Sequence, residues 1–331
     1  MLKLKYYHKI LIIRPDRIGD LTLSLPVAET IKSNHPDSAI YYLASAYAAP
    51  LLKYCDYIDD FIPYTRPDGQ KCRVAELIEG LEAHHFDLAI FLKADWLSAF
   101  AVLAANIKTR IGTSRRACSF LFNKRVAVAR KKSGMHEIDL NLRLLEPLGV
   151  ELNPGSSRPR LNPELKPWPN AKEYSLPAEY VVIHLGSKGS AANWPIDRYG
   201  ELVSRLSERI AAIVTGQGNF PIAVPNQAMS LINKTNLDDL VNILARAKLV
   251  ISGGTGPLHL AGALGKPVIG FFPNRPHLSP TRWGPRTAKS YAFTALEQSG
   301  HSCRIRDNGS CQCMDSIKID DVIGKALELL S

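Results

Sequence analysis

Short apolar runs alternate with amphipathic segments along the first half of the chain. The runs are rich in Ile, Leu, Val and Ala and predict buried strands, whereas apolar positions three or four residues apart predict helices. The expected strands cover residues 9–14, 39–44, 58–64, 87–92 and 109–111, and the expected helices cover 22–33, 50–55, 74–84, 97–105 and 138–148. This alternation predicts a parallel sheet covered by helices on both faces.

The alternation stops at residues 153–178, where six prolines interrupt a segment of little periodicity. It then restarts, with expected strands at 180–184, 210–215, 249–252 and 267–272 and expected helices at 196–209, 237–247, 257–264 and 319–330. We therefore predict two similar doubly wound α/β domains, residues 1–160 and 179–331, joined by a Pro-rich linker at 161–178.

The stretch 249–272 carries the clearest local signal, because an apolar run is followed by closely spaced glycines, a short helix and a second apolar run. The glycines (Gly253, Gly254 and Gly256) allow the backbone to approach a ligand closely. Amide N–H groups at the start of the helix favour an anion. We therefore predict a phosphate-binding corner, which suggests a nucleotide ligand.

Two further turns follow expected strands of the second domain, at residues 186–190 and 215–218. The first holds Ser187 and Lys188, which suit a phosphate loop, although a plain surface loop has the same composition. Because ligands bind beyond the carboxyl ends of the strands in such sheets, both turns and the corner are expected to converge. His259, in the first helical turn of the corner, either packs locally or contacts a phosphate or sugar.

The first expected strand ends in Arg14–Pro26, where Asp20 falls at the expected start of a helix. A helix dipole would hold this carboxylate ionised, and an ionised carboxylate at a ligand site is a competent general base. The alternative is that Asp20 only caps the helix, since Asp is a preferred cap residue. Asp16 is a second acidic residue in the same loop, and its ordinary interpretation is an aspartate that stabilises the turn.

Charge narrows the class of partner. The net charge is +10, which favours an acidic partner such as nucleic acid, anionic lipid or a phosphorylated substrate. Residues 110–132 contain eight basic residues and no Asp or Glu. This segment is either a solvated loop with an edge strand or an anion-binding face.

Composition excludes several classes of protein. With 331 residues, 46% of them hydrophobic, the chain has enough apolar material for two cores, and no apolar run is long enough to span a bilayer. The basic N-terminus lacks the apolar core of a signal peptide, which predicts a cytosolic location.

Six cysteines do not form a disulfide scaffold in a chain of this length. Cys303, Cys311 and Cys313 cluster, so a zinc site with His301 as fourth ligand is the alternative to reduced structural thiols.

Three segments of the chain match the signatures of a known family. They are ILIIRPDRIGDLTLSLPVAETIK with its Gly19-Asp20 pair, LGSKGSAANWPIDRYGEL with a Trp-Pro pair before a helix, and SGGTGPLHLAGALGKPVIGFF at the corner. Through these segments the chain resembles the ADP-heptose:lipopolysaccharide heptosyltransferases, glycosyltransferase family 9.

The resemblance implies a GT-B fold of two facing Rossmann-like domains. It also implies an inverting transfer of a heptose, or a related sugar, from a nucleotide-diphosphate donor such as ADP-heptose to a lipopolysaccharide core acceptor. The C-terminal domain would hold the donor, and the N-terminal domain would hold a phosphorylated lipid A–Kdo acceptor. No cofactor is required for the fold, and the ADP-sugar donor is a substrate. A divalent ion is left open, but no protein metal site is expected. The enzyme is expected in the cytoplasm, where attraction to anionic lipid would associate it peripherally with the inner membrane face.

The resemblance also suggests roles for individual residues. Asp20 aligns with the family's general base. The expected donor-binding residues are Ser187, Lys188, Gly216, Gln217, Gly254, Thr255, Gly256, Pro257 and His259. The expected acceptor-binding residues are Arg17, Arg110, Arg115, Arg116, Lys124 and Arg125.

The sequence departs from the family pattern at the donor motifs. Gly254 stands where the family usually has an Asp, and Ala192 and Asn193 precede Trp194 where a basic residue is usual. These departures leave the sugar open and motivate an alternative, a non-catalytic or weakly active GT-B scaffold that binds nucleotide or glycan. A nucleic-acid binder rests on charge alone, because no motif interleaves aromatic residues with that charge. No acidic D-x-D pair ends a strand of the second domain, which argues against a metal-dependent transferase.

Overall fold

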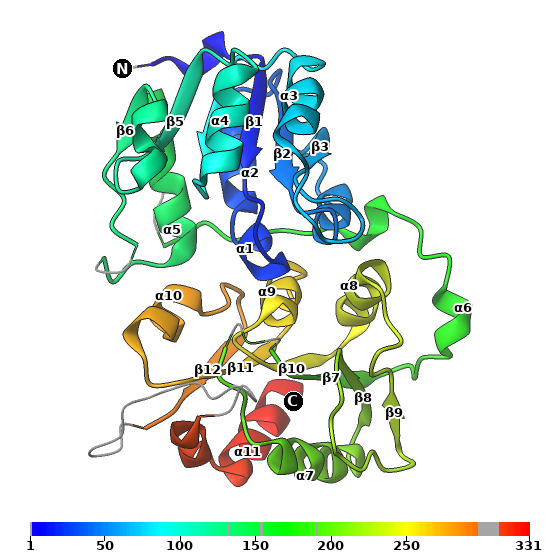
Figure 1. Ribbon diagram of the computed structural model, residues 1–331. Helices are drawn as coiled ribbons and strands as arrows, with labels where there is room; N and C mark the ends of the chain where they lie inside the picture. Colours follow the sequence, from blue (N-terminus) through cyan, green and yellow to red (C-terminus); the bar gives the residue numbers. More distant parts are fainter. Residues whose placement is uncertain (1, 131–132, 153–154, 188, 190, 297–310) are drawn as a thin grey trace. The chain divides into compact units, whose positions relative to one another are not determined.

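Two six-stranded parallel sheets form the framework of the protein, one in each of two compact units, Met1–Lys166 and Pro167–Ser331 (Figure 1). The computed structural model describes residues 2–130, 133–152, 155–187, 189, 191–296 and 311–331. In each unit the strand first in sequence lies inside the sheet, next to the fourth strand. This is the 3-2-1-4-5-6 order of a Rossmann-like fold, so the predicted doubly wound architecture is confirmed.

The sheet of the first unit has the order β3-β2-β1-β4-β5-β6. Its strands are β1 (Lys9–Ile13), β2 (Ala39–Ala44), β3 (Asp60–Pro63), β4 (Leu88–Phe91), β5 (Thr109–Thr113) and β6 (Lys124–Val126). The helices are α1 (Ile18–Thr22), α2 (Leu25–Asn34), α3 (Val74–Glu82), α4 (Trp96–Ala104) and α5 (Glu137–Leu142). Short 3-10 turns are η1 (Leu4–Tyr6), η2 (Ala49–Tyr54), η3 (Ala117–Leu121), η4 (Arg143–Leu148) and η5 (Pro163–Leu165).

Residues 10–13 of the central strand β1 are fully buried, because the sheet continues on both sides of the strand and helices cover both of its faces. Leu11 and Ile13 pack with Leu77 of α3 and Ala99 of α4 in one apolar cluster. On the other face α2 contacts α5. This continuous apolar run is typical of a parallel strand buried on both faces.

The predicted helix at 22–33 is wrong at its start, because α2 begins only at Leu25 and a separate short helix, α1, ends at Thr22, with Leu23 and Ser24 between them. Pro26 has no N–H to donate to the carbonyl of Thr22, and its ring would clash with that carbonyl in a continuous helix. Asp20 therefore lies within the short helix α1, as its third residue, and not just before the start of a longer helix.

The sheet of the second unit has the order β12-β11-β10-β7-β8-β9. Its strands are β7 (Tyr180–Leu185), β8 (Ala211–Gly216), β9 (Ala228–Ser230), β10 (Leu249–Gly253), β11 (Val268–Phe272) and β12 (Ser290–Thr294). The helices are α6 (Ala171–Tyr174), α7 (Ile196–Ser207), α8 (Leu237–Arg246), α9 (Gly256–Ala263), α10 (Pro280–Trp283) and α11 (Ile319–Leu330), with 3-10 turns η6 (Pro276–Leu278) and η7 (Gln312–Ser316). The sequence pattern missed β9 and β12, which are edge strands with little buried apolar surface.

The Pro-rich segment after residue 166 packs onto the second unit through one buried carboxylate, that of Asp239 in the first turn of α8. Asp239 accepts hydrogen bonds from Trp168 Nε1 at 2.9 Å, Asn170 Nδ2 at 3.2 Å and Tyr174 Oη at 2.7 Å. Its backbone N–H bonds the side chain of Asn236, the N-cap of α8. Asp239 therefore has a structural role. No described helix of either unit is long and apolar enough to cross a membrane.

Trp194 of the Trp-Pro pair is a core residue. Its ring stacks on Phe271 with centroids 4.7 Å apart, and its Nε1 donates to the carbonyl of Ile317 at 3.1 Å. Arg198 of α7 donates to the carbonyl of Asp315 at 2.8 Å. The segment that carries the Trp-Pro signature thus ties α7 to the C-terminal part of the same unit.

Candidate active site

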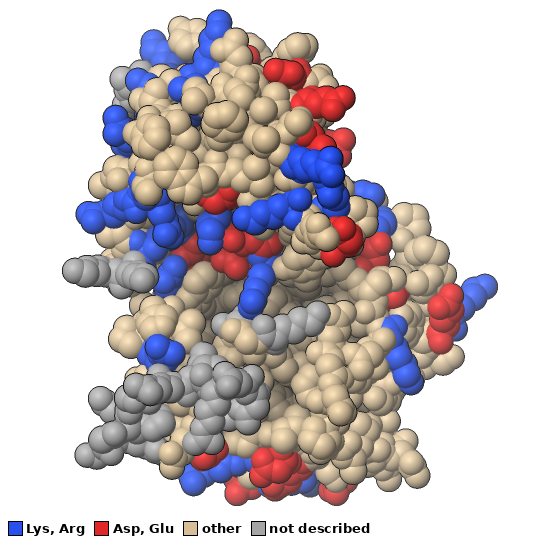
Figure 2. Space-filling model, in the orientation of Figure 1, with Lys and Arg blue, Asp and Glu red and all other residues tan. Residues whose placement is uncertain are grey.

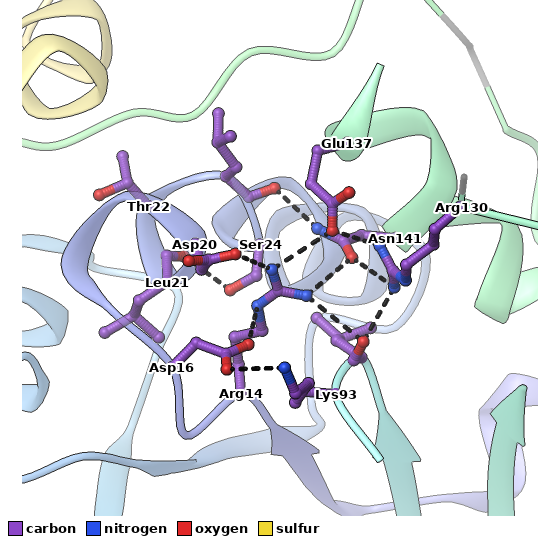
Figure 3. Close-up of polar contacts among 12 residues, drawn as sticks. Arg14, Asp16, Asp20, Leu21, Thr22, Ser24, Lys93, Arg130, Glu137 and Asn141 are labelled. Carbon is purple, nitrogen blue, oxygen red and sulfur yellow. Dashed lines mark hydrogen bonds and ion pairs between the residues drawn. The ribbon is translucent and has the colours of Figure 1, made fainter. Parts of the chain in front are cut away.

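A cluster of charged side chains lies at the carboxyl end of β1, built around the guanidinium of Arg14 (Figure 3). Arg14 directly follows the strand and is 3% exposed. Its Nη2 donates to Asp20 Oδ1 at 2.6 Å and to Glu137 Oε1 at 3.3 Å, and its Nε lies 3.1 Å from Asp16 Oδ2. One buried cation therefore fixes three carboxylates that come from three different positions in the chain.

Two more cations complete this group, which we call the charge cluster (Arg14, Asp16, Asp20, Lys93, Arg130 and Glu137). Arg130 pairs with Glu137 and also donates to Asn141 Oδ1 at 3.0 Å. Lys93, which follows β4, lies 3.3 Å from Asp16 Oδ1. Three cations and three carboxylates balance in formal charge, which is the condition for burying ionic groups at modest cost.

The surroundings shift the proton affinities of the central pair. Burial raises the pKa of Asp20, the Arg14 guanidinium lowers it, and the carboxylates of Asp16 and Glu137 raise it, so that the pKa lies above the ordinary aspartate value. Burial lowers the pKa of Arg14, but the three carboxylates raise it by more, and the guanidinium stays charged. A carboxylate with a raised pKa is a stronger base than an exposed one.

The interpretation of Asp20 as a helix cap is wrong. Arg17 is the N-cap of α1, and the Asp20 side chain binds Arg14 instead of the helix backbone. Oδ1 is held by this bond, whereas no described residue hydrogen-bonds to Oδ2, and the side chain is 28% exposed. One oxygen is thus fixed in place while the other is able to accept a proton from a ligand.

The predicted acceptor-binding cations separate into two kinds. Arg110 is committed to the fold, because its guanidinium donates to the carbonyls of Ile107 at 2.6 Å and Leu121 at 2.9 Å. The other predicted cations are exposed and make no ion pair with any described residue; they are Arg17, Arg115, Arg116, Lys124 and Arg125. These five are available to an anionic ligand.

In the second unit, the predicted corner forms as a strand–turn–helix, from β10 through Gly254 and Thr255 into α9. Thr255 is the N-cap, and its Oγ1 lies 3.0 Å from Ser252 Oγ. Gly256 and Pro257 form the first turn of α9, and His259 is buried on this helix with its ring 6.5 Å from that of Trp283. The helix start presents backbone N–H groups toward the carboxyl edge of the sheet, as an anion site requires.

The packing of Phe272 explains why residue 254 is a glycine. A Cβ at this position would lie 2.8 Å from Cε1 of Phe272, whose ring is buried at the end of β11. The backbone N–H of Gly254 donates to the carbonyl of Phe271 at 3.0 Å, which holds the turn against β11. Any larger residue at 254, including an Asp, needs the Phe272 ring to move.

The three turns converge as predicted, because β10, β7 and β8 are adjacent parallel strands. The ring of Phe220 leaves no room for a side chain at Gly186 or Gly216. A Cβ added at Gly186 would lie 2.7 Å from the ring, and one added at Gly216 would lie 2.9 Å from it. Ser187 Oγ donates to the carbonyl of Ala191 at 2.8 Å, and Gln217 is exposed at the end of β8. Lys188 lies outside the described residues.

The zinc alternative is only partly visible in the described chain. Cys303 and His301 lie outside it, and Cys311 and Cys313 are buried with their sulfur atoms 3.2 Å apart. Within the ranges that the structure describes, no group of three or more His, Cys, Asp or Glu side chains is placed to hold a metal ion.

Sequence reasoning missed most of the residues that make up the polar network around Asp20. Lys93 and Asn141 were not singled out, and Arg14 and Arg130 were noted only as parts of a motif and a basic run. One usable signal exists: Glu137 and Asn141 are polar residues at buried positions of α5, among Ile and Leu. Buried polar groups need partners, so such positions point to an internal network.

Known proteins resemble this chain over most of its length. A family model described as Glycosyltransferase family 9 (heptosyltransferase) matches residues 74–311. Lipopolysaccharide heptosyltransferase 2 of Escherichia coli strain K12 is 27% identical over 297 residues, which cover 82% of this chain and 85% of the relative.

Solved structures share the architecture of the whole chain. E. coli ADP-heptose lps heptosyltransferase II matches with a TM-score of 0.76 and 21% identity, covering 97% of this chain and 98% of the other. E. coli heptosyltransferase WaaC with ADP matches with a TM-score of 0.71 and 18% identity, covering 97% and 99%. The two Rossmann-like units therefore make a GT-B fold, and the protein is a glycosyltransferase. More specifically, the chain belongs to glycosyltransferase family 9, the heptosyltransferase family.

Proposed function

We propose that this enzyme transfers a heptose from ADP-heptose to a lipopolysaccharide core acceptor, with inversion at the anomeric carbon and Asp20 as the general base. The observation that supports the proposal is the different environment of the two oxygens of the Asp20 carboxylate. Arg14 holds Oδ1 at 2.6 Å, while Oδ2 has no described partner and the side chain reaches the surface. Relatives named as lipopolysaccharide heptosyltransferases support the choice of substrate.

In this mechanism Asp20 Oδ2 takes the proton of an acceptor hydroxyl as the hydroxyl oxygen attacks the anomeric carbon. The bond from that carbon to the donor phosphate breaks, its electron pair leaves with ADP, and the new glycosidic bond forms on the opposite face. Arg14 orients the carboxylate and lowers its pKa, which opposes the increase caused by burial. Such a positioned base contributes about 10²–10⁴-fold to the rate.

The donor diphosphate is assigned to the corner at the start of α9. The N–H groups near Thr255 and Gly256 stabilise the charge that develops on the leaving ADP. His259 and Pro257 belong to the same helical turn, and the turns holding Ser187, Lys188, Gly216 and Gln217 end neighbouring strands of one sheet edge. Structures of WaaC with ADP and with ADP-2-deoxy-2-fluoro heptose support this choice of donor.

The acceptor is assigned to the first unit, where the exposed cations Arg17, Arg115, Arg116, Lys124 and Arg125 attract the phosphates of a lipid A–Kdo core. Arg110 acts there through the fold, since it is bonded to backbone carbonyls. We further propose that the enzyme works in the cytoplasm on the inner membrane face, where this acceptor is anchored.

The decisive test is Asp20→Asn assayed with ADP-heptose and a lipid A–Kdo acceptor. We expect kcat to fall at least about a hundredfold, since the amide cannot accept the proton. Asp60→Asn, an exposed carboxylate on β3, is the control and should retain the wild-type rate. The pKa of Asp20 is raised in the folded protein, so ionising it opposes folding as pH rises, and Asp20→Asn should unfold no more easily than wild type at neutral pH. Retained turnover in Asp20→Asn would remove the base assignment.

One observation favours a second candidate, a nucleotide- or glycan-binding scaffold with little or no activity. Phe272 fills the space that an acidic side chain at residue 254 would need. Both candidates bind a nucleotide, so thermal unfolding with ADP, UDP, GDP and their sugars identifies the nucleotide, and only an assay of sugar transfer separates the two. A ligand at 100 times its Kd adds about 2.7 kcal/mol to the folded state. We expect ADP or an ADP-sugar to raise the midpoint most. Transfer from any nucleotide sugar would eliminate the scaffold.

A further inference from the structure

The outer face of α4 carries a group of exposed apolar side chains that the proposed reaction does not use. Trp96, Phe100 and Leu103 are spaced i, i+4 and i+7, so they lie on one face of the helix. They are 55%, 52% and 38% exposed. Phe120 of η3 is 66% exposed, and its ring meets that of Trp96 edge-on with centroids 5.8 Å apart. We call these four residues the aromatic patch.

The aromatic patch is not a loosely packed part of the core. On the opposite face of α4, Ser98, Ala99 and Val102 are fully buried against the sheet. The helix is capped by Asp95, whose side chain accepts from the N–H of Ser98 at 3.0 Å. A well-anchored helix that turns two large aromatic rings outward marks a surface for a partner or a membrane.

Positive charge on one side of the aromatic patch favours an anionic partner. Exposed cations border it at the end of α4, next to η3 and on β6, and none makes an ion pair with a described residue; they are Lys108, Arg115, Arg116, Lys124 and Arg125. Figure 2 shows a broad tan area over α4, with Lys and Arg, and some Asp and Glu among them, along its lower margin. Acidic residues lie on the other side, over α3, where Glu79 and Glu82 are exposed.

We infer that the aromatic patch and these bordering cations form a docking surface for an anionic lipid bilayer. Trp and Phe side chains enter the headgroup region, where Trp is favoured because its ring is amphipathic. The cations contact lipid phosphates and hold the η3–β6 side closer to the bilayer than the acidic α3 side.

A second copy of the chain fits this surface less well than a bilayer does. Four partly exposed side chains present on the order of a few hundred Å² of apolar surface. A stable dimer buries roughly 800 Å² on each partner. A bilayer needs no such area, because insertion of a few aromatic side chains and attraction of several cations act together.

The docking surface begins beside the proposed catalytic edge. Lys93, which reaches Asp16 of the charge cluster, lies in the loop that leads from β4 into α4 at Trp96. If Asp20 is the base, docking brings the edge that carries it toward a lipid-anchored acceptor. This consequence rests on the proposed function, whereas the docking itself does not.

The test is co-sedimentation of the full-length protein with vesicles of phosphatidylcholine alone and of phosphatidylcholine mixed with phosphatidylglycerol, with no donor or acceptor present. We expect binding to the mixed vesicles that weakens with salt. The double variant Phe100→Ser/Phe120→Ser should lower the partition coefficient about tenfold or more, because two rings leave the headgroup region. Tyr6→Ser, a 64% exposed aromatic residue outside the patch, is the matched control and should bind as wild type does.

Two further measurements separate insertion from surface attraction. Brominated lipid should quench the fluorescence of wild type, and Trp96→Phe should remove most of that quenching. Arg115→Glu/Arg116→Glu should abolish the preference for phosphatidylglycerol. Failure of wild type to bind the mixed vesicles would overturn the inference, as would wild-type binding by the Phe100→Ser/Phe120→Ser variant.

Light scattering without vesicles tests the second-copy alternative. A dimer that Phe100→Ser/Phe120→Ser dissociates, with vesicle binding unchanged, would also overturn the inference. Turnover on a detergent-dispersed acceptor is measured separately and should survive Phe100→Ser/Phe120→Ser. Loss of vesicle binding and loss of activity in Asp20→Asn are thus independent results.

Discussion

The Arg14 guanidinium holds Asp20 Oδ1 at 2.6 Å and reaches Glu137 Oε1 through the same nitrogen at 3.3 Å. The first residue after the central strand thereby joins a loop helix to α5, and the position of the Asp20 carboxylate depends on both. Arg14 is a positioning residue in this arrangement, because it contacts the proposed base rather than the reacting atoms.

Replacing Arg14 should therefore damage both stability and catalysis. Arg14→Met leaves three carboxylates without their shared cation in a buried site, and we expect the free energy of unfolding to fall by about 3–5 kcal/mol. Arg14→Lys should recover only part of this loss, since an ammonium cannot reproduce the fork of a guanidinium. Denaturant unfolding measures the change, with Arg143→Met, an exposed pair with Glu146, as the control of small effect. Equal stabilities of wild type and Arg14→Met would contradict the role of the buried guanidinium.

The carboxylate neighbours of Asp20 should control the pH dependence of turnover. Asp16 raises the pKa of Asp20, so Asp16→Asn should lower this pKa and move the acid limb of kcat/KM to lower pH. The sign follows because a base must lose its proton before it acts. The pH–rate profiles of wild type, Asp16→Asn and the distant control Asp60→Asn provide the measurement. An acid limb that moves to higher pH in Asp16→Asn would show that Asp16 does not act through this charge.

Gly254 should tolerate no larger side chain while Phe272 is present. Gly254→Ala places a Cβ 2.8 Å from the ring, and such overpacking costs about 1–3 kcal/mol. Gly253→Ala is the matched control, because a Cβ there meets Thr255 Cγ2 at an ordinary 3.7 Å. The effects of Gly254→Ala and Phe272→Leu on thermal or denaturant unfolding should be non-additive, since the smaller side chain relieves the clash. Strict additivity would mean that the two residues do not compete for the same space.

Asp239 should anchor residues 168–174 to the second unit. Asp239→Ala removes the acceptor of Trp168, Asn170 and Tyr174, and we expect a loss of about 2–4 kcal/mol in the free energy of unfolding. The Trp168 emission should shift to longer wavelength as its indole N–H turns to water. Asp320→Ala, a 79% exposed acid in the first turn of α11, provides the comparison and should change neither quantity appreciably. An unchanged emission spectrum in Asp239→Ala would disprove the anchor.

The sequence predicted the fold well where apolar periodicity was strong. The strand at 39–44 and the helix at 319–330 have the predicted bounds, and the corner at 249–272 forms as expected. Prediction failed where the pattern was short or exposed, as at the edge strands β9 and β12. It also failed at the break before Pro26, where a missing N–H outweighed an uninterrupted apolar pattern.

The sequence by itself determined two doubly wound units, the family signatures and Asp20 as the candidate base. These features depend on periodicity and local motifs, which involve residues close together in the chain. Only the tertiary structure decided what surrounds Asp20. Glu137 and Arg130 are more than a hundred positions away along the chain, and the folding of α5 against α2 brings them to the end of β1. The aromatic patch was decided in the same way, because the burial of one face of α4 against the sheet determines which of its apolar residues remain exposed.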